Sequence, residues 1–263
     1  MNLLDKVARR LRYYADIPSY CWYHKHVFNV TNTKFDISYC VFRESFVHDQ
    51  YGIRRFLDQI GPCRRLFFLD IGRNHGFVFY YTMYHIMKTQ KAVSVIDYYG
   101  IDPSPLKFVY FNFHEFLKKA NLRINYNIID RAVVFGQEPI AILKYGERNF
   151  GNFHVFGSNY AAGSSDNQSK FEYAQIIVET MQFSEVVQII ERNLDADAII
   201  VKIDCKNRTD QMFMAALDLL SGRNVNYLIA CEKDGSSERD SSAYIVEDPG
   251  VLRTANVVAA NRA

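Results

Sequence analysis

One segment is more informative about the fold than any other: Leu66-Phe67-Phe68-Leu69-Asp70-Ile71-Gly72-Arg73-Asn74-His75-Gly76. Its four consecutive apolar residues, soon followed by an acid, predict a strand that is buried on both faces of a parallel sheet. Residues 76–88 can continue as a helix, and Gly72 and Gly76 permit positive φ in the turn before it. The free N–H groups at a helix start favour an electron-rich or anionic partner. The segment therefore predicts a ligand-binding turn, with a tight structural turn without ligand as the alternative.

The chain after this segment continues to alternate between apolar strand-like runs and helical patterns. Such alternation predicts right-handed crossover units, and hence an α/β fold with a doubly wound, mostly parallel sheet. A short antiparallel pair is expected near the C-terminus, over 243–246 and 255–259. Ser184 is the expected N-cap of one helix. The expected strands are 66–71, 93–101, 124–135, 198–204 and 225–231, and the expected helices are 46–60, 76–88, 103–120, 184–193 and 209–220.

Two parts are expected in the chain. Residues 1–62 should form a helical and aromatic extension that packs on the core domain, residues 63–263. Within the extension, 2–14 has the pattern of an amphipathic helix, which predicts docking on the main domain or on a second subunit, with peripheral membrane attachment as the alternative. Within the core domain, 136–169 is rich in Gly, Asn, Ser and aromatic residues, which indicates a loop-rich insertion with room for a hairpin. Such an insertion commonly carries the substrate site, and a surface excursion without function is the alternative.

The composition argues against several classes of protein. The 263 residues carry 31 basic and 29 acidic side chains, a net charge of +2, so no long-range field favours nucleic acid as a partner. The five cysteines form no C-x-x-C pair, which indicates reduced thiols, and the seven histidines show no zinc-type spacing, so no metal is expected. The sequence has no signal-type N-terminus and no apolar stretch of roughly 20 residues, the length of a membrane span. We therefore expect a soluble, cytoplasmic protein.

Acidic residues end three of the expected strands. Asp70 ends the first strand, Asp102 follows the second and Asp204 ends the fourth, each after an apolar run. In open α/β sheets, ligands bind beyond the carboxyl ends of the strands. A carboxylate after the second strand suits a ribose, because two adjacent hydroxyls can donate to it. Asp102 is therefore the predicted ribose ligand. Its alternative role is the N-cap of the helix that begins at Pro103, and the two roles are compatible.

Four elements of the chain occur in an order that is similar to a known family. They are Asp70-Ile71-Gly72-Arg73-Asn74-His75-Gly76, Asp102-Pro103-Ser104-Pro105, Arg131-Ala132-Val133 and Lys202-Ile203-Asp204. This set resembles the FkbM-type family of S-adenosylmethionine-dependent methyltransferases over about residues 64–232. The resemblance implies a seven-stranded, Rossmann-like methyltransferase sheet, S-adenosylmethionine as cofactor, and a small-molecule or glycan hydroxyl as the methyl acceptor.

The resemblance also implies a set of site residues. The amino acid part of the cofactor would lie over the turn formed by Asp70, Gly72, Asn74 and Gly76, and its ribose would lie on Asp102. Asp130, near the end of the third expected strand, is the candidate acceptor for the adenine amino group. Two residues are candidates for the base that takes the proton of the acceptor hydroxyl. These are Asp204, because of its place at a strand end, and His154, because a histidine titrates near neutrality. For His154, an ordinary loop histidine is the alternative.

Two other functions compete with the methyltransferase. After Lys-Ile-Asp the family usually continues with an apolar residue, Glu-Gly and another acid, whereas this chain continues with Cys205-Lys206-Asn207. A cation in place of a carboxylate favours, as the alternative, a catalytically altered or inactive protein that serves as an interaction module. A nucleotide-dependent enzyme of another type, such as a dehydrogenase, predicts G-x-G-x-x-G after the first strand, and the turn does not supply this spacing.

Overall fold

The computed structural model describes residues 45–46, 48–73, 76–89, 92–103, 121–136, 139–146, 149–157, 173–204, 209–232, 243–248 and 256–259. The helix expected over 2–14 lies outside these ranges, as does the helix expected after Pro103. No helix in the described ranges is long and apolar enough to cross a membrane. Of the cysteines in the described ranges, Cys63 and Cys231 are both buried free thiols.

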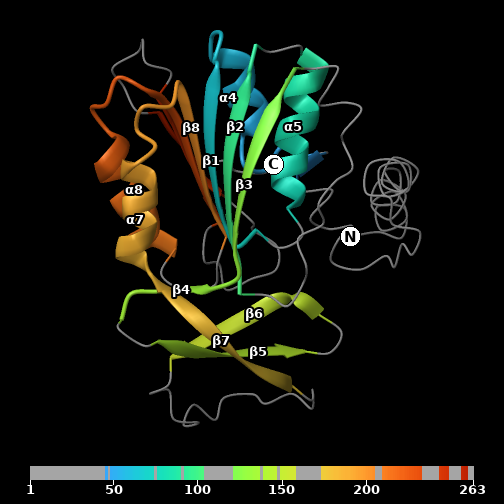
Figure 1. Cartoon of the computed structure of the whole chain (residues 1–263), viewed down its shortest axis with the longest axis vertical. Helices are drawn as coiled ribbons and strands as arrows, with labels where there is room; N and C mark the ends of the chain where they lie inside the picture. Colours follow the sequence, from blue (N-terminus) through green and yellow to red (C-terminus); the bar gives the residue numbers. More distant parts are fainter. Residues whose placement is uncertain are drawn as a thin grey trace, which may run out of the picture.

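The centre of the molecule is a mostly parallel sheet (Figure 1). Its parallel strands are β1 (Arg65–Ile71), β2 (Val95–Ile101), β3 (Arg123–Ile129), β8 (Ala198–Ile203) and β9 (Asn226–Glu232). The antiparallel strands β10 (Ala243–Asp248) and β11 (Asn256–Ala259) extend one edge, which gives the order β11-β10-β9-β8-β1-β2-β3. The predicted α/β class, the mostly parallel sheet and the terminal antiparallel pair are confirmed. The assignment of this sheet to the methyltransferase fold stays a prediction.

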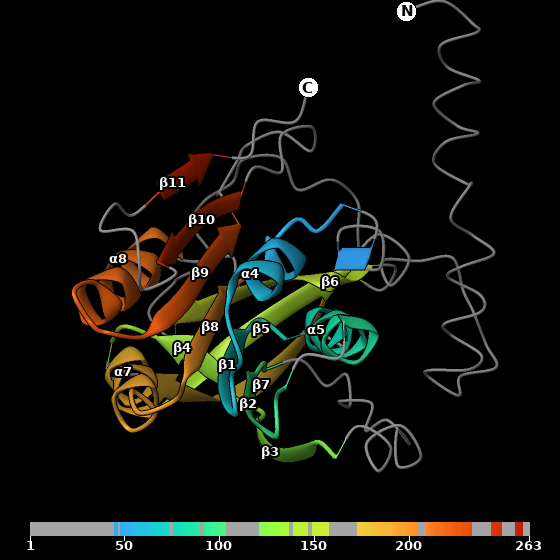
Figure 2. The ribbon, with the colours of Figure 1, turned by 90° about the horizontal axis from the view of Figure 1, so that it is seen from above.

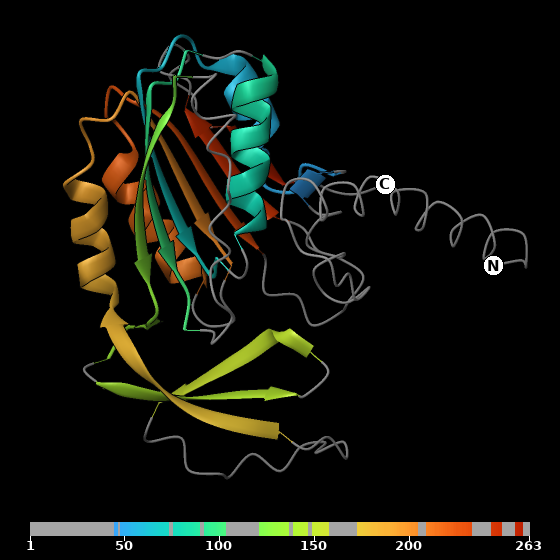
Figure 3. The ribbon, with the colours of Figure 1, turned by 45° about the vertical axis from the view of Figure 1, so that its right-hand side comes forward.

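Helices cover both faces of the sheet. One face packs against α4 (Ile53–Gln59) and α5 (Phe77–Thr89), and the other packs against α7 (Phe183–Glu191) and α8 (Thr209–Leu220) (Figures 2 and 3). Strand β8 is buried at every residue, and β1 is buried at every residue after its first. Apolar side chains on both faces of a strand explain this burial, because each face is covered by its own helical layer.

Two helices begin at residues other than those expected. The helix expected from residue 46 begins only at Ile53, because Asp49 and Gly52 adopt positive φ of 48° and 67° and interrupt the helical path. The helix expected to be capped by Ser184 begins at Phe183 with Gln182 as its N-cap. There the side chain of Glu185 accepts a hydrogen bond from Gln182 N at 2.9 Å, which satisfies one of the free N–H groups of the helix start.

A second sheet lies beyond the carboxyl ends of the parallel strands (Figures 1 and 3). It consists of β4 (Ala132–Val134), β5 (Ile140–Gly146), β6 (Asn149–Gly157) and β7 (Tyr173–Gln182), in the order β4-β7-β5-β6. The strand expected over 124–135 is therefore divided between two sheets, with the break at the polar pair Asp130-Arg131. The hairpin for which the loop-rich insertion left room is formed by β5 and β6.

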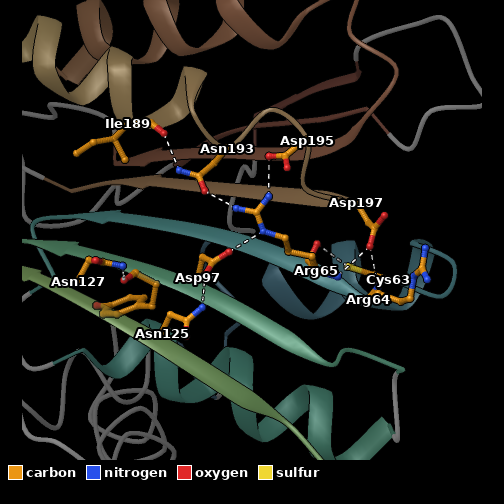
Figure 4. A network of polar contacts seen from close by, with 11 residues as sticks. Cys63, Arg64, Arg65, Asp97, Asn125, Asn127, Ile189, Asn193, Asp195 and Asp197 are labelled. Carbon is orange, nitrogen blue, oxygen red and sulfur yellow. Dashed lines mark hydrogen bonds and ion pairs between the residues drawn. The ribbon is translucent and has the colours of Figure 1, made fainter.

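The amino ends of the parallel strands are joined by a polar network around Arg65 (Figure 4). The Arg65 guanidinium donates to Asp97 at 2.7 Å, to Asn193 at 2.7 Å and to Asp195 at 2.6 Å. The Asn125 amide donates to the other oxygen of Asp97 at 2.6 Å. The network therefore connects β1, β2 and β3 with the segment that precedes β8.

Candidate functional site

The order of the parallel strands reverses at β1, where a ligand-binding crevice is expected in an α/β sheet. The chain leaves β1 toward α5 on one face of the sheet, whereas α8 follows β8 on the opposite face (Figure 2). Backbone hydrogen bonds join the carboxyl ends of β1, β2 and β8. Asp204 N donates to Ile71 O at 2.9 Å, and Gly72 N donates to Ile101 O at 2.8 Å. The residues that follow β1, β2 and β8 therefore lie side by side.

The turn after β1 has the backbone conformation that its glycines allow. Gly72 and Gly76 adopt positive φ of 73° and 81°, a region that other residues enter only with strain. Gly76 N donates to Arg73 O at 2.7 Å, and Gly76 O accepts from Tyr80 N at 3.0 Å, so the turn runs directly into α5. Asn74 lies outside the described residues.

A buried lysine connects the turn to the two strand ends. Lys202 on β8 is 2% exposed, and its Nζ donates to Gly72 O at 2.6 Å. The same Nζ lies 3.1 Å from Asp70 Oδ1, in a carboxylate with no exposed surface, and 3.3 Å from Asp204 Oδ2. Burial alone would lower the pKa of Lys202, but the charges of the two carboxylates outweigh burial and raise the pKa above its ordinary range. Lys202 is therefore a cation shared by two acids.

Two tyrosines complete this cluster. Tyr98 Oη donates to Asp70 Oδ2 at 3.0 Å, and Tyr51 Oη donates to Asp204 Oδ2 at 2.8 Å. The Tyr51 ring also faces the Lys202 ammonium, with 5.5 Å between Nζ and the ring centroid. Burial, assisted by the charge of Asp70, raises the pKa of Tyr98 well above its ordinary value, so its hydroxyl stays a donor. We refer to Tyr51, Asp70, Tyr98, Lys202 and Asp204 as the strand-end cluster.

The predicted site residues occupy different positions relative to this cluster. Asp70 and Asp204 belong to it, but only Asp204, at 32% side-chain exposure, reaches the surface. Asp102 is buried at the end of the neighbouring strand, where its N–H donates to the carbonyl of the last residue of β3 at 3.1 Å. Asp130 follows β3 and accepts a hydrogen bond from Arg73 at 2.5 Å. His154 belongs to β6 in the second sheet, opposite Lys144.

Sequence reasoning quoted Lys202 within a motif but gave it no role, and it did not consider Tyr51 or Tyr98. The signal for Lys202 was present, because it is a charged residue inside the otherwise apolar run 198–203. A charge at such a position has to find a partner of opposite sign. No comparable signal marks Tyr51, which is separated from its partner Asp204 by 153 positions.

A separate groove opens beside α7. It has a volume of about 480 Å³ and is lined by Phe135, Gln182, Phe183, Ser184, Val187, Gln188 and Glu191. The rings of Phe135 and Phe183, two of these lining residues, stack with 4.8 Å between their centroids. None of its lining residues belongs to the strand-end cluster, so the groove is distinct from the predicted cofactor site.

No protein-family model, no curated protein and no solved structure matches the chain. The family resemblance therefore depends on the four elements quoted from the sequence. Within the described ranges, no group of three or more His, Cys, Asp or Glu side chains is arranged to hold a metal ion.

Proposed function

We propose that this chain is an S-adenosylmethionine-dependent methyltransferase that methylates a hydroxyl group of a small molecule or glycan. The observation that carries the proposal is the arrangement at the reversal of strand order. There, a turn with positive φ at Gly72 and Gly76 leads into α5, and a hydrogen bond of 2.8 Å from Gly72 N to Ile101 O sets this turn beside Asp102. A glycine turn before a helix and an acid on the adjacent strand are the two features that bind nucleoside cofactors in such sheets.

In this proposal the chain holds the cofactor by the turn and by Asp102. The glycines let the backbone approach the amino acid part of the cofactor, and Asp102 accepts hydrogen bonds from the ribose hydroxyls. Asp70 has no exposed surface, so it acts through Lys202, which in turn holds the carbonyl of Gly72. When bound, S-adenosylmethionine supplies an electrophilic methyl group carried by a sulfonium.

Asp204 is the proposed base for the acceptor hydroxyl. Its Oδ2 is held by the Tyr51 hydroxyl at 2.8 Å and by Lys202 at 3.3 Å, so the carboxylate is oriented while part of it remains exposed. Methyl transfer depends mainly on alignment of the acceptor, and a positioned carboxylate can take the proton that the hydroxyl loses. The second sheet, which includes His154, lies beyond the same strand ends and is the proposed support for the acceptor (Figure 1).

A cofactor-binding module without turnover is the second candidate. The feature in its favour is that Lys202 and Tyr51 already occupy one oxygen of Asp204. An acceptor hydroxyl has to compete with these two donors for that oxygen. Both candidates predict cofactor binding, and they differ only in methyl transfer.

Two measurements test the proposal. Calorimetric titration with S-adenosylmethionine and S-adenosylhomocysteine should give heat for both ligands, and the absence of heat at millimolar ligand would refute both candidates. Incubation with a labelled methyl donor and candidate acceptors then separates them. Transfer that is lost in Asp204→Ala, but retained in a matched variant of the exposed carboxylate on α8, Asp218→Ala, supports the methyltransferase. Binding without transfer supports the module.

A further inference from the structure

Arg73 follows an unexpected path through the carboxyl end of the sheet. It lies in the turn between Gly72 and Gly76, yet its side chain is only 1% exposed. Its Nη2 donates to Asp130 Oδ1 at 2.5 Å, although Asp130 follows β3 and β2 lies between β1 and β3. The side chain of Arg73 therefore spans the width of β2 to reach its partner.

A glycine on β2 leaves room for this path. A Cβ added at Gly100 would lie 2.7 Å from Arg73 Cδ and 2.8 Å from Tyr98 Oη, both too short for a real side chain. In the register of the sheet, Gly100 pairs with Asp70 on β1 and with Ile128 on β3. Arg73 therefore crosses β2 at the level of the strand-end cluster, and any larger residue at position 100 would displace it.

We infer that Arg73 is a positioning residue whose ion pair with Asp130 fixes the shape of the cofactor turn. The inference rests on the proposed function for the identity of the ligand, and it adds a residue that the family resemblance did not assign. It also gives Asp130 a role other than the predicted contact with adenine. In this reading the carboxylate serves the protein, because it compensates a buried guanidinium that anchors the turn.

The energetics of the pair suit this role. A guanidinium that is removed from water needs a compensating charge, so Arg73 depends on the pair. Asp130 is 72% exposed, so water can solvate its carboxylate when Arg73 is absent. The Arg73 backbone makes hydrogen bonds of its own, from its N–H to Ile101 O at 3.4 Å and from Gly76 N to its carbonyl at 2.7 Å. Side chain and backbone together tie the centre of the turn to β2 and to the end of β3.

Amide hydrogen exchange of the protein without ligand tests whether the Arg73–Asp130 pair holds the turn in place. The variants are Arg73→Met, Asp130→Ala and both together, with the slowly exchanging amides of β9 as the internal reference. We expect the turn amides to exchange about tenfold faster in each single variant, and the double variant to add little, because contacting residues are coupled. Unchanged exchange in Asp130→Ala, or additive effects in the double variant, would overturn the inference.

The chain offers a matched control for this cycle. Arg131 and Glu179 form an ion pair of 3.1 Å close to Asp130 in the sequence, but both side chains are exposed. Arg131→Met and Glu179→Ala change the same charges without removing a buried partner, so the turn amides should exchange as in the wild type. An equal acceleration in the control pair would show that charge alone is responsible and would overturn the inference.

Ligand affinity separates the positioning role from a direct contact with adenine. The probes are S-adenosylhomocysteine and its inosine analogue, in which oxygen replaces the adenine amino group. A positioning role predicts that Asp130→Ala weakens both ligands by the same factor, about tenfold. A loss confined to S-adenosylhomocysteine would overturn the inference in favour of adenine recognition. If the wild type binds neither ligand, the proposed function fails, whereas hydrogen exchange still decides the role of Arg73.

Discussion

The two ends of the parallel sheet carry polar clusters that differ in their access to water. At the amino ends, Arg65 is 30% exposed and its partner Asp195 is 76% exposed (Figure 4). At the carboxyl ends, Lys202 and Asp70 are almost completely buried, and one cation serves two carboxylates. Both clusters join neighbouring strands, but the cation of the first is partly exposed, whereas the cation of the second is buried.

This difference in the burial of the two cations bears on the roles of the two clusters. Exposed ion pairs contribute little to stability, and the protein can hold them at little cost. A buried ion pair is often no more stabilising than apolar residues of the same volume, so stability alone does not account for it. Groups of this kind cluster at functional sites. The burial of the carboxyl-end cluster therefore agrees with the proposed ligand site, whereas the amino-end network joins the strands of the sheet.

The largest effect is expected from Lys202→Met. This change leaves the carboxylate of Asp70 buried without its cation, and we expect the free energy of unfolding to fall by about 3–5 kcal/mol. Denaturant unfolding measures this loss. Adding Asp70→Asn should restore part of it, because an amide carries no charge. Lys88→Met, at an exposed position on α5, is the control and should change stability little. A loss below about 1 kcal/mol in Lys202→Met would show that this buried ion pair contributes no more than an exposed one, and would contradict the difference between the two ends of the sheet.

Gly72→Val should abolish cofactor binding while the fold survives. Valine at a φ of 73° is strained by about 1–2 kcal/mol, and its side chain blocks the approach of the ligand. Gly222, which follows α8, has a φ of 76° and open space around it, so Gly222→Val carries the same strain away from the site. Calorimetry should show binding in Gly222→Val and none in Gly72→Val. Equal affinity in the two variants would show that the ligand does not use the turn after β1.

The sequence predicted the parallel core well because local patterns determine it. Helix α8 has the predicted bounds, and β8 ends one residue before the predicted end, since mostly apolar segments between turn residues have few alternatives. The second sheet was not predicted, because only a loop-rich insertion with room for a hairpin was expected there. Its strand β5 pairs with β7 in a register that joins Ile140 to Glu179, and no local pattern specifies a partner so distant in the sequence.

The candidate site was predicted in part for the same reason. The positions of Asp70 and Asp204 at strand ends could be predicted from the apolar runs before them. In the structure both carboxylates contact the same lysine, Lys202. The pairing of Asp70 with Lys202 required the register between β1 and β8, in which these two residues are direct neighbours. The path of Arg73 across β2 required a glycine at position 100, which the sequence contains but does not explain. Contacts between distant segments were therefore the part that the sequence could not supply.

Arg65→Ala tests the amino-end network and should have a smaller effect than the loss of Lys202. The change removes three hydrogen bonds of a partly exposed guanidinium, and we expect a loss of about 1–2 kcal/mol. Denaturant unfolding at about 0.05 M and about 0.5 M salt should show a smaller loss at the higher concentration, because water and salt reach the network. Arg123→Ala, at the exposed start of β3, is the control. A loss that is large and insensitive to salt would contradict the solvent-exposed character of this end.

The stability of the protein at alkaline pH should distinguish the two ends of the sheet, because their buried groups lose their protons over different pH ranges. Burial, followed by the charge of Asp197, raises the pKa of Cys63 at the amino end from 9.0 to about 12. A raised folded-state pKa stabilises the protein fully below the unfolded value, and this contribution is lost as the pH rises from 9.0 to about 12. The contribution of Lys202 follows the same sign but begins to fall only above the ordinary lysine pKa of about 10.4. Between these two onsets, the stability of the wild type should therefore decrease more steeply with pH than that of Cys63→Ala, as measured by denaturant unfolding. Parallel curves for the two proteins would mean that the Cys63 thiol titrates in the folded state as it does in the unfolded chain.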